Sequence, residues 1–427
     1  MRQRLTLLSL IFSALVFGQK TYLHCGQVLD VKSGKMLKAQ TLVITGNTIS
    51  DVQSGYIPPT ESQDQAIDLK NMTVLPGFID MHVHLEGESN PQSYIQRFTL
   101  NEADVAFLST LYAKKTLMAG FTTVRDLGGS GVNIALRKAI DRGTVVGPRV
   151  FTAGKAIAST GGHADPTNGM RNDLKGDPGP KEGVVNSPRD GVKAVRQRYK
   201  DGADVIKITA TGGVLSVAKS GQNPQFTVEE IKAITETAKD YNMLTAAHAH
   251  GDEGMQRAVI GGIKTIEHGT LMSEKTMDLM VQYDAYLVPT ITAGKQVTEK
   301  AKIPGYFPKV VAQKASEIGP KVQNTFGKAY KKGVPIAFGT DAGVFPHGEN
   351  AREFKYMVEA GMPALEAIQS ATITNANLLG MEKDLGQLKK GFLADIVAVE
   401  GNPLEEINIL ESIGFVMKDG KVYQQPN

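Results

Sequence analysis

The stretch Gly77-Phe78-Ile79-Asp80-Met81-His82-Val83-His84 decides the fold. It follows a Pro-Gly turn and has the apolar character of a buried β-strand. Side chains alternate between the two faces of a strand, so His82 and His84 point to one side and Val83 to the other. Two imidazoles that converge on one point are typical of a metal site. Alternatively, His82 is a buried structural histidine and His84 a loop residue.

Downstream of this stretch, short apolar runs alternate with helical patterns up to about residue 384. We predict eight strands, at Phe78–His84, Thr122–Asp126, Arg149–Thr152, Val205–Ala210, Leu244–His248, Thr265–His268, Tyr286–Thr290 and Pro335–Thr340. Helical patterns separate them, among others at Asp104–Met118, Arg189–Lys200, Thr227–Lys239, Glu274–Gln282 and Val310–Lys331. This alternation predicts an α/β fold, a (β/α)8 TIM barrel over residues 77–384. No Gly-rich phosphate fingerprint follows the first strand, which disfavours a doubly wound sheet.

Both ends of the chain differ from the middle in their sequence pattern. Residues 20–76 and 385–427 contain short β-rich segments separated by Gly, Asn and Asp turns. We therefore expect the two ends to pair into one small composite β-sandwich domain beside the barrel. A barrel of about 250 residues plus such a domain fits the length of 427 residues.

Composition and the N-terminal residues indicate the cellular setting. Residues 1–19 combine Arg2 and Arg4 with a short apolar run, which predicts a signal peptide and hence a periplasmic or secreted protein without a membrane anchor in its mature form. Basic and acidic residues number 47 and 44, so the sequence does not support nucleic-acid binding. The single cysteine, Cys25, excludes a disulfide within the chain.

Reactive side chains gather where the predicted strands end. In (β/α)8 barrels these carboxyl ends meet at one mouth and carry the chemistry. The first strand ends at His82 and His84, the fifth at His248 and His250, the sixth at His268, and the eighth at Asp341; Lys207 lies on the fourth, and His163 in the loop after the third. The sequence therefore predicts one site built from side chains far apart in the chain.

Lys207 is unusual because Ile206 and Ile208 flank it on an inner strand. Burial lowers the pKa of a lysine and favours the neutral amine, which can react with carbon dioxide to form an anionic carbamate able to bridge two cations. In the alternative interpretation the stem packs in the core and the ammonium reaches an acid such as Asp126. Asp341 adds a carboxylate, and imidazole plus oxygen ligands favour two Zn²⁺ ions, although manganese or cobalt also fits.

These residues match the motifs of a known family. The chain resembles the amidohydrolase superfamily in Pro76–His84, Asp204–Ile208, Ala247–Gly251, Ile266–Gly269 and Gly339–Gly343. Gly162–Asp165, His248–Gly251 and Pro346–Asn350 are similar to its prolidase-like branch, which includes Xaa-Pro dipeptidases, related carboxypeptidases and enzymes that cleave ochratoxin-type N-acyl amino acids.

The resemblance implies a role for each residue. His82, His84 and Asp341 would bind one metal, His248 and His268 the other, and carboxylated Lys207 would bridge them. Asp341 would also take the proton of a hydroxide-forming water between the metals and pass it to the leaving nitrogen, and His163 would contact the substrate carbonyl. His250, two residues after His248, is favoured as a substrate contact over a metal ligand, and His347 either orders a mouth loop or touches substrate. Arg125 and Asp126 are candidates for binding a substrate carboxylate and supporting Lys207.

The predicted function is a binuclear metal-dependent amidohydrolase. Its substrate would be a small molecule, with cleavage at the amide bond before a C-terminal amino acid in Xaa-Pro-like dipeptides or N-acyl amino acids, including ochratoxin-type amides. The alternatives are a cyclic-amide hydrolase of the imidazolonepropionase type and a non-catalytic metal- or ligand-binding barrel. Serine and zincin mechanisms lack their motifs in the sequence. Assembly into a homo-oligomer is possible, as for many barrels.

Overall fold

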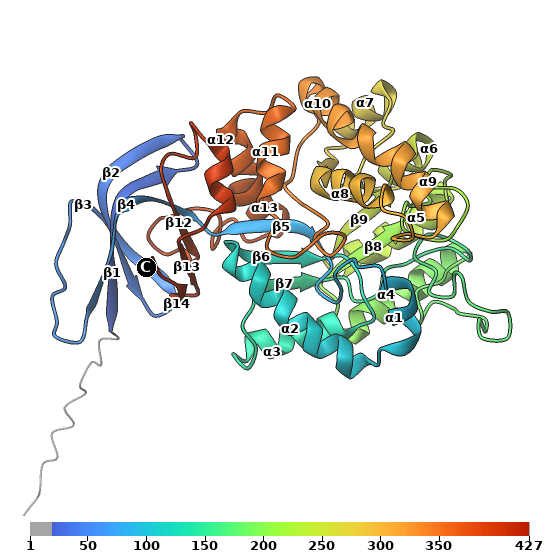
Figure 1. Ribbon diagram of the computed structural model, residues 1–427, viewed down its shortest axis with the longest axis horizontal. Helices are drawn as coiled ribbons and strands as arrows, with labels where there is room; N and C mark the ends of the chain where they lie inside the picture. Colours follow the sequence, from blue (N-terminus) through green and yellow to red (C-terminus); the bar gives the residue numbers. More distant parts are fainter. Residues whose placement is uncertain (1–18, 427) are drawn as a thin grey trace, which may run out of the picture.

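The computed structural model describes residues 19–426 of the chain. A β-rich part built from both ends of the chain lies at one side of the molecule, and the alternating strands and helices of the middle form the larger part (Figure 1). The predicted signal peptide, residues 1–19, lies almost wholly outside the described residues. No helix within residues 19–426 has both the length and the apolar character needed to cross a membrane.

The β-rich part is one seven-stranded sheet with the strand order β14-β13-β12-β4-β1-β2-β3. Its strands are β1 (Lys20–Asp30), β2 (Lys35–Thr45), β3 (Thr48–Ser54), β4 (Gln65–Pro76), β12 (Ile396–Glu400), β13 (Phe415–Lys418) and β14 (Lys421–Gln424). The long strand β4 pairs with β1 in parallel and with β12 in antiparallel orientation, so it joins the two ends of the chain. Pairing through β4 therefore joins both ends of the chain, and their buried residues form one core cluster; the sandwich arrangement itself stays a prediction.

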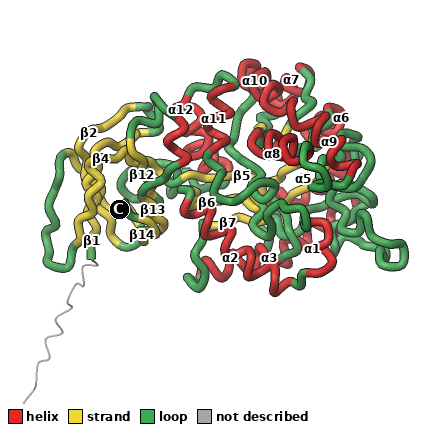
Figure 2. Tube along the Cα trace, viewed as in Figure 1, coloured by secondary structure: helices red, strands yellow, loops and turns green. Residues whose placement is uncertain are grey.

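Seven of the eight predicted strands of the middle part are present, and Figure 2 shows β5, β6 and β7 among the helices. They form two parallel sheets, of orders β5-β6-β7 and β11-β10-β9-β8. The strands are β5 (Phe78–Val83), β6 (Phe121–Asp126), β7 (Arg149–Thr152), β8 (Val205–Thr209), β9 (Leu244–Ala249), β10 (Thr265–His268) and β11 (Tyr286–Val288). Every residue of β5, β6 and β8 is buried, as expected for parallel strands covered on both faces.

The predicted eighth strand, Pro335–Thr340, is not a continuous strand. The Pro335 carbonyl accepts a hydrogen bond from Leu287 of β11 (2.8 Å), and the Phe338 carbonyl accepts one from Met81 of β5 (3.0 Å). This segment therefore contacts β11 on one side and β5 on the other. Isolated parallel bridges join Ile336 to Leu287 and Ala342 to Val83, so the pairing is interrupted along this segment.

Helices follow the parallel strands. They are α1 (Ser93–Thr99), α2 (Glu102–Met118), α3 (Val132–Asp141), α4 (Pro188–Asp201), α5 (Val228–Asp240), α6 (Asp252–Ile260), α7 (Glu274–Gln282), α8 (Ile291–Ala301), α9 (Lys309–Ile318), α10 (Val322–Lys332), α11 (Arg352–Glu359), α12 (Ala364–Gln369) and α13 (Asn375–Leu378), with short turns η1 (Gly319–Lys321), η2 (Ser370–Thr374) and η3 (Ile407–Glu411).

Local sequence signals explain where these helices begin and end. Thr227 caps α5, because its hydroxyl accepts from the Glu230 amide while the Glu230 carboxylate accepts from the Thr227 amide. The single helix predicted over 310–331 is wrong: α9 ends at Ile318 and α10 begins at Val322. Pro320 lacks the amide proton that a continuous helix needs at that position, so the chain forms the short turn η1 instead.

Candidate metal centre

A cavity of about 560 Å³ lies at the carboxyl ends of the parallel strands. Its wall contains all the site residues that the sequence predicts: His82, His84, His163, Lys207, His248, His250, His268 and Asp341. The structure thus brings together side chains that are up to 259 positions apart in the sequence. The site is built from the ends of the four strands β5, β8, β9 and β10 and from the segments that follow β7 and residues 335–340.

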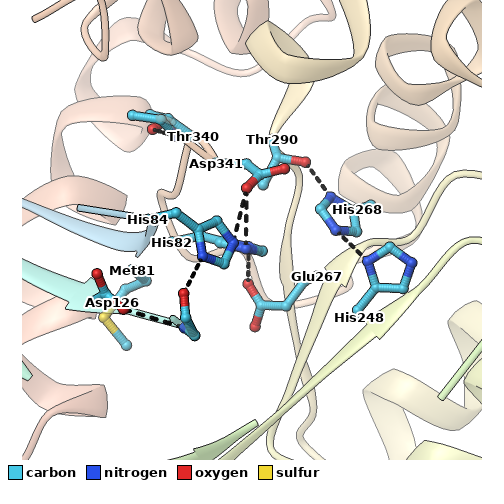
Figure 3. A network of polar contacts seen from close by, with 12 residues as sticks. Met81, His82, His84, Asp126, His248, Glu267, His268, Thr290, Thr340 and Asp341 are labelled. Carbon is cyan, nitrogen blue, oxygen red and sulfur yellow. Dashed lines mark hydrogen bonds and ion pairs between the residues drawn. The ribbon is translucent and has the colours of Figure 1, made fainter. Parts of the chain in front are cut away.

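The first set of donors comes from β5 and Asp341. Oδ1 of Asp341 lies 3.4 Å from Nε2 of His82 and 3.3 Å from Nε2 of His84, and both rings point toward the carboxylate (Figure 3). This buried oxygen forms no hydrogen bond within residues 19–426. A buried, unsatisfied carboxylate oxygen that faces two imidazole nitrogens fits a divalent cation among these atoms.

The second set of donors comes from β9 and β10. Nε2 of His268 lies 2.9 Å from Nδ1 of His248, and Nδ1 of His268 lies 2.7 Å from the Thr290 hydroxyl (Figure 3). Ligand atoms of His248, His250 and His268 lie within 4.8 Å of one another. His268 also belongs to a group of the same size with His82 and Asp341. The two sets therefore adjoin through His268, and their geometry suits divalent metal ions.

Lys207 lies on β8 and is only 4% exposed. Burial lowers the pKa of its ammonium to about 8, although Glu267 and Asp341 act in the opposite direction. No hydrogen bond or ion pair of its amine occurs among the described residues, so the alternative interpretation of a lysine paired with Asp126 lacks the expected contact. Asp126 instead accepts from the Leu85 amide and the Asn133 side chain.

Burial holds four of the imidazoles in the neutral form that binds metals. Burial lowers the pKa of His82 and of His250 to about 4, and it lowers the pKa values of His248 and His268 well below the ordinary range. For His84, burial acts in the same direction, but the adjacent Asp341 carboxylate outweighs it and raises the pKa. Neutral imidazole offers a lone pair, which a cation requires.

Glu267 and Arg125 lie behind the first set, and the sequence alone did not reveal this pairing. Oε2 of Glu267 lies 2.9 Å from Nδ1 of His82, and its Oε1 accepts from the Arg125 guanidinium at 2.9 Å. Arg125 is fully buried and also donates to the Met81 carbonyl. The hypothesis that Arg125 binds a substrate carboxylate is therefore wrong, because its donors are engaged below the cavity wall.

Asp80 also supports the metal centre, from the other side of β5. It is fully buried and accepts from the His82 and Thr340 amides, the Thr340 hydroxyl and the Asn350 side chain. These bonds connect β5 with residues 340–350. Asp80 thereby fixes the backbone on which His82 and Asp341 are placed.

Three residues at the site have strained backbone conformations. His268, Thr290 and Asp341 have φ angles of 73°, 52° and 62°, in the left-handed region that residues other than glycine rarely adopt. Buried Glu353 accepts hydrogen bonds from the amides of Ile291 and Thr292 and so holds the turn after Thr290. The strain is thus maintained by surrounding contacts and directs the side chains into the cavity.

His163 lies over the second set of donors. Its ring stacks on His248 with 4.3 Å between ring centroids, and its Nδ1 has no hydrogen-bond partner within residues 19–426. A Cβ atom on Gly213 would lie 2.3 Å from this ring, so the glycine is required for the close approach. His163 therefore has a ring nitrogen available in the cavity, as a substrate contact requires.

His347 and His24 lie elsewhere. His347 is buried, its Nε2 lies 3.0 Å from the Gly87 carbonyl, and it is not part of the cavity wall. Of the two roles considered, the structure favours ordering of the mouth loop. His24 is in β1, where its Nε2 contacts the Ile57 carbonyl at 2.8 Å.

Comparisons with known proteins agree with this geometry. The amidohydrolase family model matches residues 73–423. Ochratoxinase from Aspergillus niger is 31% identical over 432 residues, with 95% of this chain and 87% of that protein covered. The crystal structure of a Xaa-Pro dipeptidase with bound methionine in the active site is 54% identical, with a TM-score of 0.92 and coverage of 95% of this chain and 100% of that chain.

A third relative is a prolidase in complex with N-methylphosphonate-L-proline. Its structure is 33% identical to this chain, with a TM-score of 0.87, and the match covers 95% of this chain and 100% of that one. The family match extends over more than half of the chain, and the closely similar structures share its whole architecture. The chain therefore belongs to the amidohydrolase family, in its prolidase-like branch, and is a metal-dependent hydrolase that acts on amide bonds.

Proposed function

We propose that the protein uses two divalent cations to hydrolyse the amide bond before a C-terminal amino acid, in dipeptides or N-acyl amino acids. The observation that carries this proposal is the presence of two adjoining sets of donors, one around Asp341 and one around His248, which share His268. A single cation would leave one set of buried donors unsatisfied. Zn²⁺ is the expected ion, because imidazole and carboxylate ligands predominate.

Lys207 supplies the remaining ligand in this proposal. Its amine is buried and close enough to influence the pKa values of His82, His248 and His268. A neutral amine adds to carbon dioxide and releases a proton, which leaves a carbamate with two oxygen donors. Carboxylated Lys207 would then hold both cations and replace an unpaired ammonium by an anion between them.

The chain's own residues would perform the proton transfers and the positioning. The cations, when bound, would activate water and polarise the amide carbonyl. Asp341, held between His82 and His84, would accept the proton of the attacking water and deliver it to the leaving nitrogen. His163 would donate to the carbonyl oxygen as negative charge develops there, and His250 would contact the substrate beside it.

The substrate class is supported by the relatives and by the cavity wall. One relative is an ochratoxinase, and solved structures include a Xaa-Pro dipeptidase with bound methionine. Val214, Leu215, Val297, Ile318 and Val322 form an apolar side of the cavity. Such a wall suits an apolar side chain next to the scissile amide.

Four further features of the protein are proposals or predictions. We infer that the two parallel sheets belong to one closed (β/α)8 barrel, supported by the bonds of residues 335–338 to β11 and β5 and by the bond from the Ile157 amide to the Lys207 carbonyl. The division into residues 77–384 and the two terminal β-rich segments stays a prediction. Export guided by residues 1–19 and assembly into a homo-oligomer also stay predictions.

A hydrolysis panel tests the proposed reaction. Purified protein supplied with Zn²⁺ is incubated with Xaa-Pro and other dipeptides, N-acyl amino acids and a cyclic amide of the imidazolone type. We expect release of the C-terminal amino acid from linear substrates. Hydrolysis of the cyclic amide alone would support the imidazolonepropionase alternative instead. Loss of turnover in Asp341→Ala would separate the protein's own activity from a contaminant.

A further inference from the structure

The positively charged side chains around the cavity differ in whether they already form hydrogen bonds or ion pairs within the protein. Arg125 is paired with Glu267, and the Lys314 ammonium donates to the carbonyls of Gly213, Ser216 and Ala218. At the rim, Lys300 donates to the Val344 carbonyl and Arg97 to the Pro166 carbonyl. Arg125 and Lys314 are thus held by several bonds within the protein, whereas Lys300 and Arg97 each donate to one backbone carbonyl and lie outside the cavity wall.

Lys155 is different. It lines the cavity and is half-buried, yet its ammonium forms no hydrogen bond or ion pair with any described residue. The other lysine in the wall is Lys207, which belongs to the metal centre. Within the part of the chain that the structure describes, Lys155 is thus the cavity-lining lysine whose three donors are free for a ligand.

The position of Lys155 places this charge beside the first set of donors. It follows β7 in the segment Gly154-Lys155-Ala156. A Cβ atom on Gly128 would lie 3.4 Å from Cβ of Ala156 and 3.9 Å from the His84 ring, so this segment packs close to His84. A ligand anchored by Lys155 therefore extends from the His84 side of the cavity.

Only two carboxylates in the cavity wall could compete with an anionic ligand for Lys155. Asp341 is a metal-centre residue, and Glu182, the other acid in the wall, accepts from the Gly179 amide at 3.0 Å; the Gly179 bond and, to a smaller extent, the charge of Lys155 lower the pKa of Glu182, but no ion pair joins the two side chains. The apolar residues Val214, Leu215 and Ile318 form another part of the wall. A ligand with one carboxylate and one apolar side chain meets a complementary group for each in this cavity.

We propose that the Lys155 ammonium binds the free carboxylate of the substrate's C-terminal amino acid and makes the enzyme specific for substrates that end in a carboxylate. This inference rests on the proposed function, because it concerns the leaving amino acid of that reaction. Lys155 takes no part in bond cleavage. It orients the leaving residue, so that the amide before it reaches the metal centre.

The test compares acid and amide forms of one substrate. The substrates are the best dipeptide of the hydrolysis panel and its C-terminal carboxamide. The proteins, all loaded with Zn²⁺, are the wild type, Lys155→Met, Lys155→Arg and the control Lys181→Met, which removes an exposed lysine outside the cavity wall. We expect Lys155→Met to lower kcat/KM for the acid by about 10- to 100-fold, mainly through KM, since one charge-assisted contact is lost.

The carboxamide distinguishes recognition from a general structural effect. Lys155→Met should change its kcat/KM by no more than about twofold, because a neutral end gains little from an ammonium. Lys155→Arg should restore most of the preference for the acid, and Lys181→Met should leave both rates unchanged. An equal loss for acid and carboxamide in Lys155→Met, or an unchanged preference, would overturn the inference.

Binding of the leaving amino acid gives a measurement that does not need turnover. Calorimetric titration of the Zn²⁺-loaded protein with L-leucine and with L-leucinamide should show weaker L-leucine binding in Lys155→Met by about 10- to 100-fold. Equal L-leucine affinity in both proteins would contradict the role of Lys155. A wild type that binds L-leucine through Lys155 but cleaves no linear amide would refute the proposed function alone.

Discussion

Oε2 of Glu267 lies 2.9 Å from Nδ1 of His82, on the side of the ring opposite to Asp341. The carboxylate is itself fixed by Arg125, so a chain of buried polar contacts orients the imidazole. A carboxylate behind a metal-binding histidine sets which nitrogen carries the proton and strengthens the other as a ligand. Glu267 is therefore part of the metal centre without facing the substrate.

This relationship predicts the effect of Glu267→Gln. The amide keeps the shape of the side chain but removes the negative charge, so we expect metal affinity to fall by about 10- to 100-fold. Competition with a chelator, followed by metal analysis, measures the change. Glu182→Gln is a matched control, since its carboxylate is exposed and lies outside both donor sets. Unchanged affinity in Glu267→Gln would refute the orienting role.

His163→Asn tests stabilisation of the substrate carbonyl. We expect kcat to fall by about 100- to 1,000-fold, as for the loss of one donor to a developing oxyanion. Metal content should stay at the wild-type level, because His163 is outside both donor sets that suit a cation. His24→Gln, in the terminal sheet, is the control and should keep full activity. A loss of metal in His163→Asn would instead indicate a ligand role.

Lys314→Met tests the loop after β8. Three donors of this buried ammonium hold the carbonyls of Gly213, Ser216 and Ala218, and the loop carries Leu215 into the cavity wall. We expect KM for apolar substrates to rise by about 10-fold, and proteolysis within residues 212–221 to become faster. Lys309→Met, at the exposed start of the same helix, should change neither. An unchanged KM in Lys314→Met would show that the hydrogen bonds of Lys314 do not position the loop.

Glu353 predicts a dependence of stability on pH. Burial raises the pKa of the Glu353 carboxyl to about 8, well above its ordinary value of 4.5. A raised folded-state pKa means that the folded protein binds the proton more tightly, so this contribution is present below about pH 4.5 and is lost as pH rises through about 8. As the pH rises from 5 to 8, the thermal midpoint of the wild type should therefore decrease relative to that of Glu353→Gln.

Other buried carboxyls titrate in both proteins. Burial also raises the pKa values of Asp80 and Asp126 to about 6, so only the difference between wild type and Glu353→Gln isolates Glu353. Both proteins should be compared at the same metal content. Parallel curves for the two proteins over this pH range would show that Glu353 does not change its proton affinity on folding.

The metal-binding side chains could be predicted from the sequence because they obey simple periodicity. His82 and His84 alternate on one strand, and the strand ends of an α/β fold meet at one mouth. The same alternation hides the role of Glu267, because it places Glu267 and His268 on opposite faces of the strand. The φ angle of His268, 73°, breaks the alternation, so that Glu267 contacts His82 while His268 contacts His248.

Long-range partners could not be predicted from local patterns. Arg125 and Glu267 are 142 positions apart, and nothing near either residue indicates that they pair in the core. The break between α9 and α10 did have a local signal, Pro320, which the helical pattern on both sides obscured. The single terminal sheet depends on β4 pairing on both edges, which burial patterns do not specify.

The most direct test of the central claim is the metal content of the purified wild type, measured by mass spectrometry together with amide hydrolysis. We expect about two divalent cations per chain, loss of hydrolysis when a chelator removes them, and recovery with Zn²⁺. We also expect fewer bound cations in Lys207→Met. Full hydrolysis by protein that holds no divalent cation, or that holds only one at saturation, would refute the two-cation mechanism.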